Sequence, residues 1–269
     1  MADFTARDVQ ALRAATGAGM LDAKRALTES DGDPEAAAKW LRERGLGKAA
    51  ERAGRESQEG AVAVSYDAAA NAIALVQLRS ETDFGAKSPD FVNLVNDLAA
   101  LVAAEGEDAV DQRKAAIEDL NIVIKENVQV GEVVRFQAGP GSVVDSYLHV
   151  QNDRGVNGVI VELSGGSQEL AHDIAVHIAF GKPKYLRRED VPTEEIDAER
   201  ATVEAEVRRE GKPEAAVPKI VEGKLNGWFK RAPGGVLLEQ PYAKDDHQTV
   251  SQVLGGAQIV RFAQVVIGG

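Results

Sequence analysis

Few residues in this chain have the types and spacing that catalysis or metal binding requires. The chain holds four histidines, at positions 149, 172, 177 and 247, and no cysteine. Without cysteine there is no thiolate nucleophile, no disulfide and no thiolate metal ligand. His172 and His177 are five residues apart in a predicted helix, so they lie on different faces and lack metal-ligand spacing. A metal site or a histidine-based active site is therefore not indicated.

Glycine-rich loops that bind phosphate are also missing. Neither Gly-x-x-x-x-Gly-Lys-Ser/Thr nor Gly-x-Gly-x-x-Gly after a strand occurs, and Gly45-Leu46-Gly47-Lys48 lacks a preceding strand. Four glutamates, at positions 194, 195, 204 and 206, could act as acids or bases. They fall in a predicted exposed pair of helices, where contact with solvent is enough to explain why charged residues occur. Nothing singles out a serine as a nucleophile, so a hydrolase with an unrecognised site stays open as an alternative.

The most informative segment is residues 80–89, SETDFGAKSP, called the corner below. A strand-like apolar run, residues 72–78, leads into it, and a helix-like run, residues 91–98, follows it. Connections between rigid elements commonly carry recognition residues. An acidic residue and an aromatic residue, Asp83 and Phe84, stand side by side here. Phe84 could equally pack under the next helix while Asp83 caps it, and the residues alone leave both interpretations open.

Composition and charge are typical of an ordinary globular protein. Hydrophobic residues make up 44% and charged residues 28% of 269 residues, enough for a substantial core in two or more units. The formal net charge of −12 argues against nucleic acid as the main ligand, because lysine and arginine supply most of such affinity. One basic cluster departs from this balance. A solvated helix face and linker is favoured over an RNA-binding patch as the explanation of its residues, which are Lys39, Arg42, Arg44, Lys48, Arg52 and Arg55.

The N-terminus and the apolar runs indicate where the protein works. Residues 1–5 have neither the basic region nor the apolar core of a secretory signal. No run approaches the roughly 18 apolar residues that span a bilayer. The absence of cysteine makes a reducing compartment the simplest setting. We expect a cytoplasmic protein with no membrane partner.

Residues 1–45 predict three short helices in a ubiquitin-associated-like bundle. Asp33 has the position of an N-cap before the third helix, which begins at Pro34 and is expected to end at Gly45. Such a small unit is marginal alone and usually serves to bind. Residues 46–59 are charged and interrupted by glycine, and they predict a partly helical linker. An adaptor that binds another translation or chaperone protein through this bundle is a second alternative.

From residue 60 the hydrophobic period changes to that of strands. Residues 60–140 predict a first half of the core, with the order strand, strand, corner, helix. Residues 141–192 and 232–269 repeat that order and predict a second, related half. The expected fold class is α+β, with two antiparallel sheet-plus-helix halves. Residues 193–231, two amphipathic runs joined by a short turn, predict an inserted antiparallel helical hairpin.

Many separate motifs resemble those of the bacterial elongation factor Ts family and occur in that family's order. The resemblance runs through nearly the whole chain. Its main motifs are LR at 12–13, TGAGM at 16–20, ETDF at 81–84, AVHIA at 175–179, REDVP at 188–192, KIVEGK at 219–224 and LEQPY at 238–242.

The resemblance implies a guanine-nucleotide exchange factor that is not an enzyme and needs no cofactor. Its implied partner is elongation factor Tu in the GDP form, with no direct nucleic acid and no small-molecule substrate. In that family one segment enters the partner's GTPase domain, displaces Mg²⁺ and promotes GDP release so that GTP can bind. The resemblance implies that this segment is Thr82, Asp83, Phe84 and Gly85 here. Further partner contacts correspond to Arg13, Met20, Leu21, Lys24 and His149.

Local roles are the alternatives for three of these contacts: a surface ion pair for Arg13, the bundle core for Met20 and a turn cap for His149. The chain also departs from the family pattern in three places. Gly85 stands where the family usually has valine, and Lys125 stands where a glycine precedes Glu-Asn. Residues 154–158, RGVNG, replace a more compact glycine-arginine turn in the second half.

Overall fold

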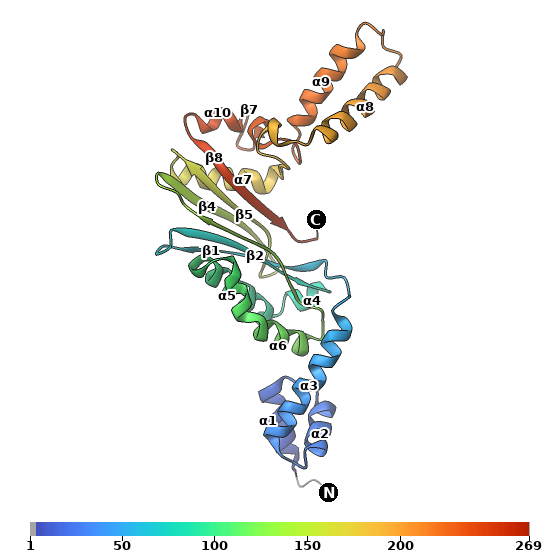
Figure 1. Ribbon diagram of the computed structural model, residues 1–269, viewed down its shortest axis with the longest axis vertical. Coiled ribbons are helices and arrows are strands. Elements are labelled where there is room, and N and C mark those ends of the chain that lie inside the picture. The colour runs from blue at the N-terminus through green and yellow to red at the C-terminus, as the bar shows by residue number, and fades with distance from the viewer. Residues whose placement is uncertain (1–3, 269) are drawn as a thin grey trace.

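The computed structural model describes residues 4–268 and is elongated (Figure 1). Three helices form its N-terminal end, two layers of β-sheet with flanking helices form the middle, and a helical hairpin projects from the opposite end (Figure 1). The predicted α+β fold class is confirmed. Among the described residues, no helix is long and apolar enough to cross a membrane.

The N-terminal bundle consists of α1 (Ala6–Thr16), α2 (Met20–Glu29) and α3 (Pro34–Arg52). A capping box between Thr5 and Asp8 begins α1, because each side chain accepts a hydrogen bond from the other residue's backbone N–H. The three helices bury a small apolar core of Val9, Leu12, Ala23, Ala26, Leu27 and Ala37.

Helix α3 does not end at Gly45, so that expectation was wrong. Asp33 caps its first turn by accepting the Glu35 N–H at 2.9 Å, and the helix continues to Arg52. Gly45 serves close packing instead, because a Cβ there would lie 2.7 Å from Cγ2 of Ile122. The missing side chain therefore lets the helix pass against the core. The proposed division of the chain at residues 45 and 59 stays a prediction.

The first half of the core is a three-stranded antiparallel sheet covered by helices on one face. Its order is β1 (Glu59–Asp67), β2 (Ala72–Ser80), β3 (Gln129–Gln137). Helices α5 (Pro89–Glu105) and α6 (Lys114–Ile124) supply much of its outer core (Figure 1). Apolar residues at helical spacing in α5 are buried there: Phe91, Val95, Leu98 and Val102.

The sequence also predicts a second helix in this half, near residues 109–120, and the structure places its start later. Gly106, with φ of 111°, ends α5, and the 3₁₀ turn η1 (Glu107–Arg113) follows. Arg113 then pairs with Asp97 of α5, with 2.5 Å between Nε and Oδ2. This contact holds the turn against α5, and α6 begins only at Lys114.

The second half repeats the arrangement. Its sheet has the order β4 (Ser142–Gln151), β5 (Arg154–Ser164), β8 (Gln258–Val266), all antiparallel. Helices α7 (Gln168–Gly181) and α10 (Val250–Leu254) bury its outer face. Short segments complete it: η2 (Arg188–Asp190), η3 (Leu237–Glu239), β6 (Pro241–Tyr242) and β7 (Asp245–Thr249).

The two sheets pack against each other through their inner faces, where Val62, Ile73 and Ile160 are buried. Gly155 permits the closest approach, because a Cβ there would lie 2.1 Å from the Val62 carbonyl oxygen. The neighbouring Arg154 donates to the Gly60 carbonyl and to the Glu59 carboxylate. The departure from the family pattern at 154–158 thus lies in the contact between the halves.

The inserted hairpin consists of α8 (Thr193–Arg209) and α9 (Val217–Phe229). Its arms share a narrow apolar seam of Val203, Val207, Val217, Val221 and Leu225. Because only this seam needs covering, the pair can extend away from the core, as Figure 1 shows.

Candidate functional site

The corner begins where β2 ends at Ser80 and contains a single helical turn, α4 (Asp83–Ala86). Thr82 caps this turn by accepting the Gly85 N–H on its Oγ1 at 3.2 Å. Ser88 then caps α5, with the Phe91 N–H 3.4 Å from its Oγ. Two caps in series therefore fix the backbone on both sides of Phe84.

Phe84 projects from this turn, and its residue is 81% exposed. It does not pack under α5, where Phe91 is fully buried instead. Lys87 lies with its Nζ 5.8 Å from the centre of the Phe84 ring. A large aromatic side chain is thus presented to solvent on a short, capped turn.

Asp83 pairs with Lys87 one turn further along the chain. The hydrogen bond from Lys87 is the main cause that lowers the pKa of Asp83, with smaller contributions from the charges of Lys87 and Arg154. Asp83 is therefore a carboxylate at neutral pH. The helix cap comes from Thr82, so the capping role considered for Asp83 is not what the structure has.

Glu126 lies beneath the corner in the connection between α6 and β3. Its carboxylate accepts three hydrogen bonds: from the Thr82 N–H at 3.0 Å, the Thr82 hydroxyl at 2.5 Å and the Ser80 hydroxyl at 2.5 Å. Glu126 was not among the residues predicted from the sequence, although the departure at Lys125 directly precedes it. That departure was the one available signal.

Gly85 is buried in α4 against this carboxylate. A Cβ at Gly85 would lie 2.6 Å from Oε2 of Glu126. The glycine is therefore a close-packing position beneath the exposed Phe84.

Three of the predicted contact residues lie on the first turns of α2. Met20 is 47% and Leu21 82% exposed, and Lys24 is also exposed. Arg13 is exposed near the end of α1. Neither Arg13 nor Lys24 forms an ion pair with another described residue. Met20 lies outside the buried bundle core, which other residues fill.

His149 is exposed on β4, beside a register shift and the exposed Val150. Its side chain makes no hydrogen bond within the part of the chain that the structure describes, so it does not cap a turn there. His149 belongs to the β4–β5 hairpin, which also carries Arg154. Arg154 pairs with Glu59 of β1, and Glu59 lies opposite Ser80, where β2 ends and the corner begins. The structure thus brings the end of this hairpin toward the corner.

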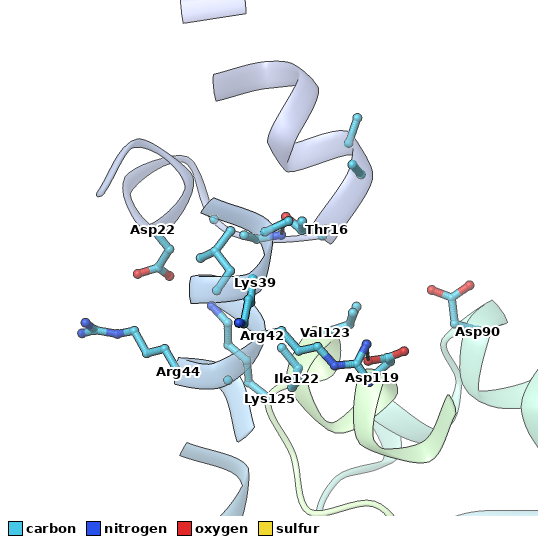
Figure 2. Close-up of a pocket in the computed structure, with 18 of the residues that line it drawn as sticks. Thr16, Asp22, Lys39, Arg42, Arg44, Asp90, Asp119, Ile122, Val123 and Lys125 are labelled. Carbon is cyan, nitrogen blue, oxygen red and sulfur yellow. Dashed lines mark hydrogen bonds and ion pairs between the residues drawn. The ribbon is translucent and has the colours of Figure 1, made fainter. Parts of the chain in front are cut away.

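A cavity of about 800 Å³ lies between the bundle and α6, beside the place where α3 packs on Ile122, and Figure 2 shows Arg42 and Asp119 directed toward one another beside it. Their charged atoms are 3.1 Å apart. Much of the basic cluster makes contacts of this kind: Arg52 donates to the Asn121 carbonyl and Arg55 to Glu81. These contacts favour a structural role for the cluster over nucleic-acid binding. The cavity lining does not include the corner's Phe84.

Two further histidines contact neighbouring residues of the second half. His177 is buried, with Nε2 2.9 Å from the Gln240 side-chain oxygen and Nδ1 accepting the Ala243 N–H at 3.1 Å. His172 is exposed and lies 3.4 Å from Asp145. Within residues 4–268, no three histidine, aspartate or glutamate side chains are grouped to hold a metal ion.

Comparison with known proteins agrees with the motifs. The family model described as elongation factor TS matches residues 81–269, beginning at the corner. Elongation factor Ts of Renibacterium salmoninarum is 44% identical over 282 residues, covering 100% of both chains. Elongation factor Ts of Streptomyces griseus is 42% identical over 280 residues with the same coverage, and that of Thermobifida fusca is 40% identical over 284.

Full-length similarity of this degree places the protein among translation elongation factors. Within that class the chain belongs to the elongation factor Ts family, whose members are nucleotide exchange factors. The resemblance inferred from the motifs is confirmed.

Proposed function

We propose that this protein binds elongation factor Tu in its GDP form, displaces Mg²⁺ and promotes GDP release so that GTP can bind. The observation that carries the proposal is the corner, where Phe84 is 81% exposed on a turn whose backbone is capped on both sides. A phenylalanine this exposed contributes little to the protein's own fold. Aromatic side chains of this kind are typical anchors in protein interfaces.

The proposed action begins with insertion of Phe84 into the partner's GTPase domain. Because α4 is capped and Gly85 is packed on Glu126, little conformational entropy is lost when the side chain is buried by the partner. Insertion would displace partner elements that position Mg²⁺. Loss of Mg²⁺ coordination would weaken the hold on the GDP phosphates, since the ion normally neutralises their charge.

Asp83 is proposed to contribute charge next to the inserted ring. Its pKa is lowered mainly by the Lys87 hydrogen bond, so it carries a negative charge at neutral pH. Lys87 contacts both Asp83 and the Phe84 ring and orders the two side chains together. Thr82 and Gly85 act as the cap and the packed base of the same turn.

The bundle is proposed to supply a second contact with the same partner. Met20 and Leu21 expose apolar surface on α2, and Lys24 and Arg13 add positive charge beside it. Met20 is suited to an adaptable contact because its side chain is unbranched and flexible. His149 is proposed as a third contact, from the second half of the core.

Linkage provides the experiment. If the factor weakens GDP binding to elongation factor Tu, GDP must weaken factor binding by the same ratio. The dissociation constant of the complex is measured with nucleotide-free and with GDP-loaded elongation factor Tu, and GDP binding to the isolated chain is measured alongside. We expect much weaker binding to the GDP-loaded form and no GDP binding by the chain itself. Equal affinity for both forms, or micromolar GDP affinity of the isolated chain, would contradict the proposal.

A further inference from the structure

Two connections that are far apart in sequence hold each other by crossed hydrogen bonds. Glu126, between α6 and β3, accepts the Thr82 N–H of the corner at 3.0 Å. Glu81, in the corner, accepts the Asn127 N–H of the other connection at 2.7 Å. Each carboxylate thus binds the backbone of the opposite segment. We call this pair of contacts the carboxylate clasp.

Glu126 makes the larger contribution to the corner. Besides the Thr82 N–H, it accepts the hydroxyls of Ser80 and Thr82, and Ser80 is fully buried. Among the described residues, no lysine or arginine forms an ion pair with Glu126. The three hydrogen bonds that its carboxylate accepts all come from Ser80 and Thr82 of the corner. Hydrogen bonds to an ionised acceptor are stronger than neutral ones. Its charge is therefore directed at the residues that precede Phe84.

The second connection also holds the segment that follows α3, the bundle's last helix. The Asn127 side chain donates to the carbonyl oxygens of Ala53 at 3.3 Å and Arg55 at 2.8 Å. Arg55 in turn pairs with Glu81 at 3.3 Å. Residues 126–127 therefore contact the corner on one side and the segment after α3 on the other.

We infer that Glu126 is a positioning residue for nucleotide exchange, which holds the Thr82 backbone so that Phe84 is presented in one orientation. This inference rests on the proposed function. Glu126 itself lies beneath the turn and acts through Phe84. Losing its charge should leave the fold intact and let the turn sample other orientations, so that partner binding must first order it.

The test uses Glu126→Gln, which keeps the shape and removes the charge. We expect about tenfold slower stimulated GDP release from elongation factor Tu, since weakening several charge-assisted hydrogen bonds can account for that factor. Glu118→Gln is the matched control, because Glu118 is an exposed residue of α6 without a side-chain partner among the described residues. It should exchange at the wild-type rate.

A double-mutant cycle separates positioning from general damage. If Glu126 acts through Phe84, then Glu126→Gln should have no further effect on exchange in a Phe84→Ala background. Full additivity of the two changes would overturn the inference. So would a Glu126→Gln protein that exchanges as fast as wild type.

Amide hydrogen exchange of the isolated chain gives a readout that needs no partner. Protection of the Thr82 and Gly85 amides should fall about tenfold in Glu126→Gln while that of β2 stays unchanged. Unchanged protection at both amides would contradict the positioning role. Ser80→Ala, which removes one of the three donors, takes the place of Glu126→Gln if that variant does not fold.

The two hypotheses fail in different ways. A wild-type chain that does not accelerate GDP release refutes the proposed function, whatever the Thr82 amide shows. A wild-type chain that does accelerate it, with Glu126→Gln indistinguishable from wild type, refutes the inference alone.

Discussion

At the scale of single residues, Phe84 combines high exposure with a rigid base. Its neighbours in α4, Gly85 and Ala86, are buried, while its own residue is 81% exposed. Truncating it removes little from the protein's own core. Its contribution is therefore expected in binding.

Phe84→Ala should lower exchange far more than it lowers stability. An aromatic interface anchor costs about 2 kcal/mol or more of binding when it is truncated, whereas a buried phenylalanine costs roughly 3–5 kcal/mol of folding. Thermal unfolding and the GDP-release rate are measured on the same variant. A large fall in Tm with near-normal exchange at a temperature where the variant is folded would make Phe84 a structural residue.

Gly85→Val should slow exchange although valine is common at this position in the family. The new Cβ would lie 2.6 Å from Glu126 Oε2 and push the carboxylate away from Thr82. The carboxylate is the far end of a flexible side chain and can move aside, so the cost in folding stability should be small. Gly227→Val in α9 is the control for adding valine to a helix, because a Cβ there meets nothing within 4 Å. Wild-type exchange by Gly85→Val would contradict the role given to this close contact.

The sequence was sufficient to locate the corner but not the residues beneath it. Phe84 could be found because it follows a strand and precedes a helix in the chain. Glu126 lies 44 residues beyond Thr82, and only the folded β2 and β3 strands bring them together. The exposure of Phe84 was undecided for the same reason, since Phe91 could have changed places with it.

At the scale of elements, the predicted strands and most helices were right because their apolar residues repeat at regular intervals. The errors lie where tertiary packing overrides a local signal. Gly45 resembled a helix end, but it is the point where α3 packs on Ile122. The start of α6 was placed too early because the 3₁₀ turn η1 has helix-like composition.

Helix α6 ends at a strained residue. Lys125 adopts the left-handed conformation, with φ of 60° and ψ of 32°, at the position where the family has glycine. Lys125→Gly should therefore stabilise the protein by up to about 1 kcal/mol, after allowance for the greater freedom of glycine in the unfolded chain.

Urea unfolding measures this change. Ala100→Gly, at an exposed position in the middle of α5, provides the comparison and should destabilise by about 1 kcal/mol, since glycine is unfavourable inside a helix. A loss of stability in Lys125→Gly as large as that in Ala100→Gly would mean that the left-handed cap costs nothing.

The packing of α7 makes stability depend on pH. Burial lowers the pKa of His177, only partly offset by the hydrogen bond with Gln240. The folded state therefore binds this proton less readily than the unfolded state, whose histidine has a pKa of about 6.5. Stability from this group is fully present above about pH 6.5 and is lost as the pH falls through that value toward the lower pKa of the folded state.

Thermal unfolding between pH 7.5 and 5 tests this dependence. His172→Gln, on the exposed face of the same helix, should keep the wild-type loss of Tm, whereas His177→Gln should flatten it. An identical pH slope in His177→Gln and wild type would exclude His177 as its source.

At the scale of the whole molecule, the bundle and the corner are held by the same part of the core. Arg42 of α3 pairs with Asp119 of α6 at 3.1 Å, and Asn127 holds the segment after α3. This arrangement supports the proposal that both contact one partner. The division of the chain into residues 1–45, 46–59, 60–140, 141–192 with 232–269, and 193–231 stays a prediction.

Removal of residues 1–55 should leave a folded core that exchanges poorly. The two sheets have their own buried clusters, so circular dichroism should retain the strand signal. The contacts proposed for Arg13, Met20 and Lys24 would be lost. A folded truncated core that exchanges at the full rate would remove the contact role from the bundle.

The central claim is tested most directly by the release of fluorescent GDP from elongation factor Tu, followed in excess unlabelled GDP with and without this protein. We expect release to accelerate with increasing concentration of the wild-type chain and then to saturate as the complex forms. We also expect Phe84→Ala to lose most of the acceleration at the same concentrations. A release rate that is independent of the wild-type chain, at concentrations where complex formation is demonstrated, would contradict it.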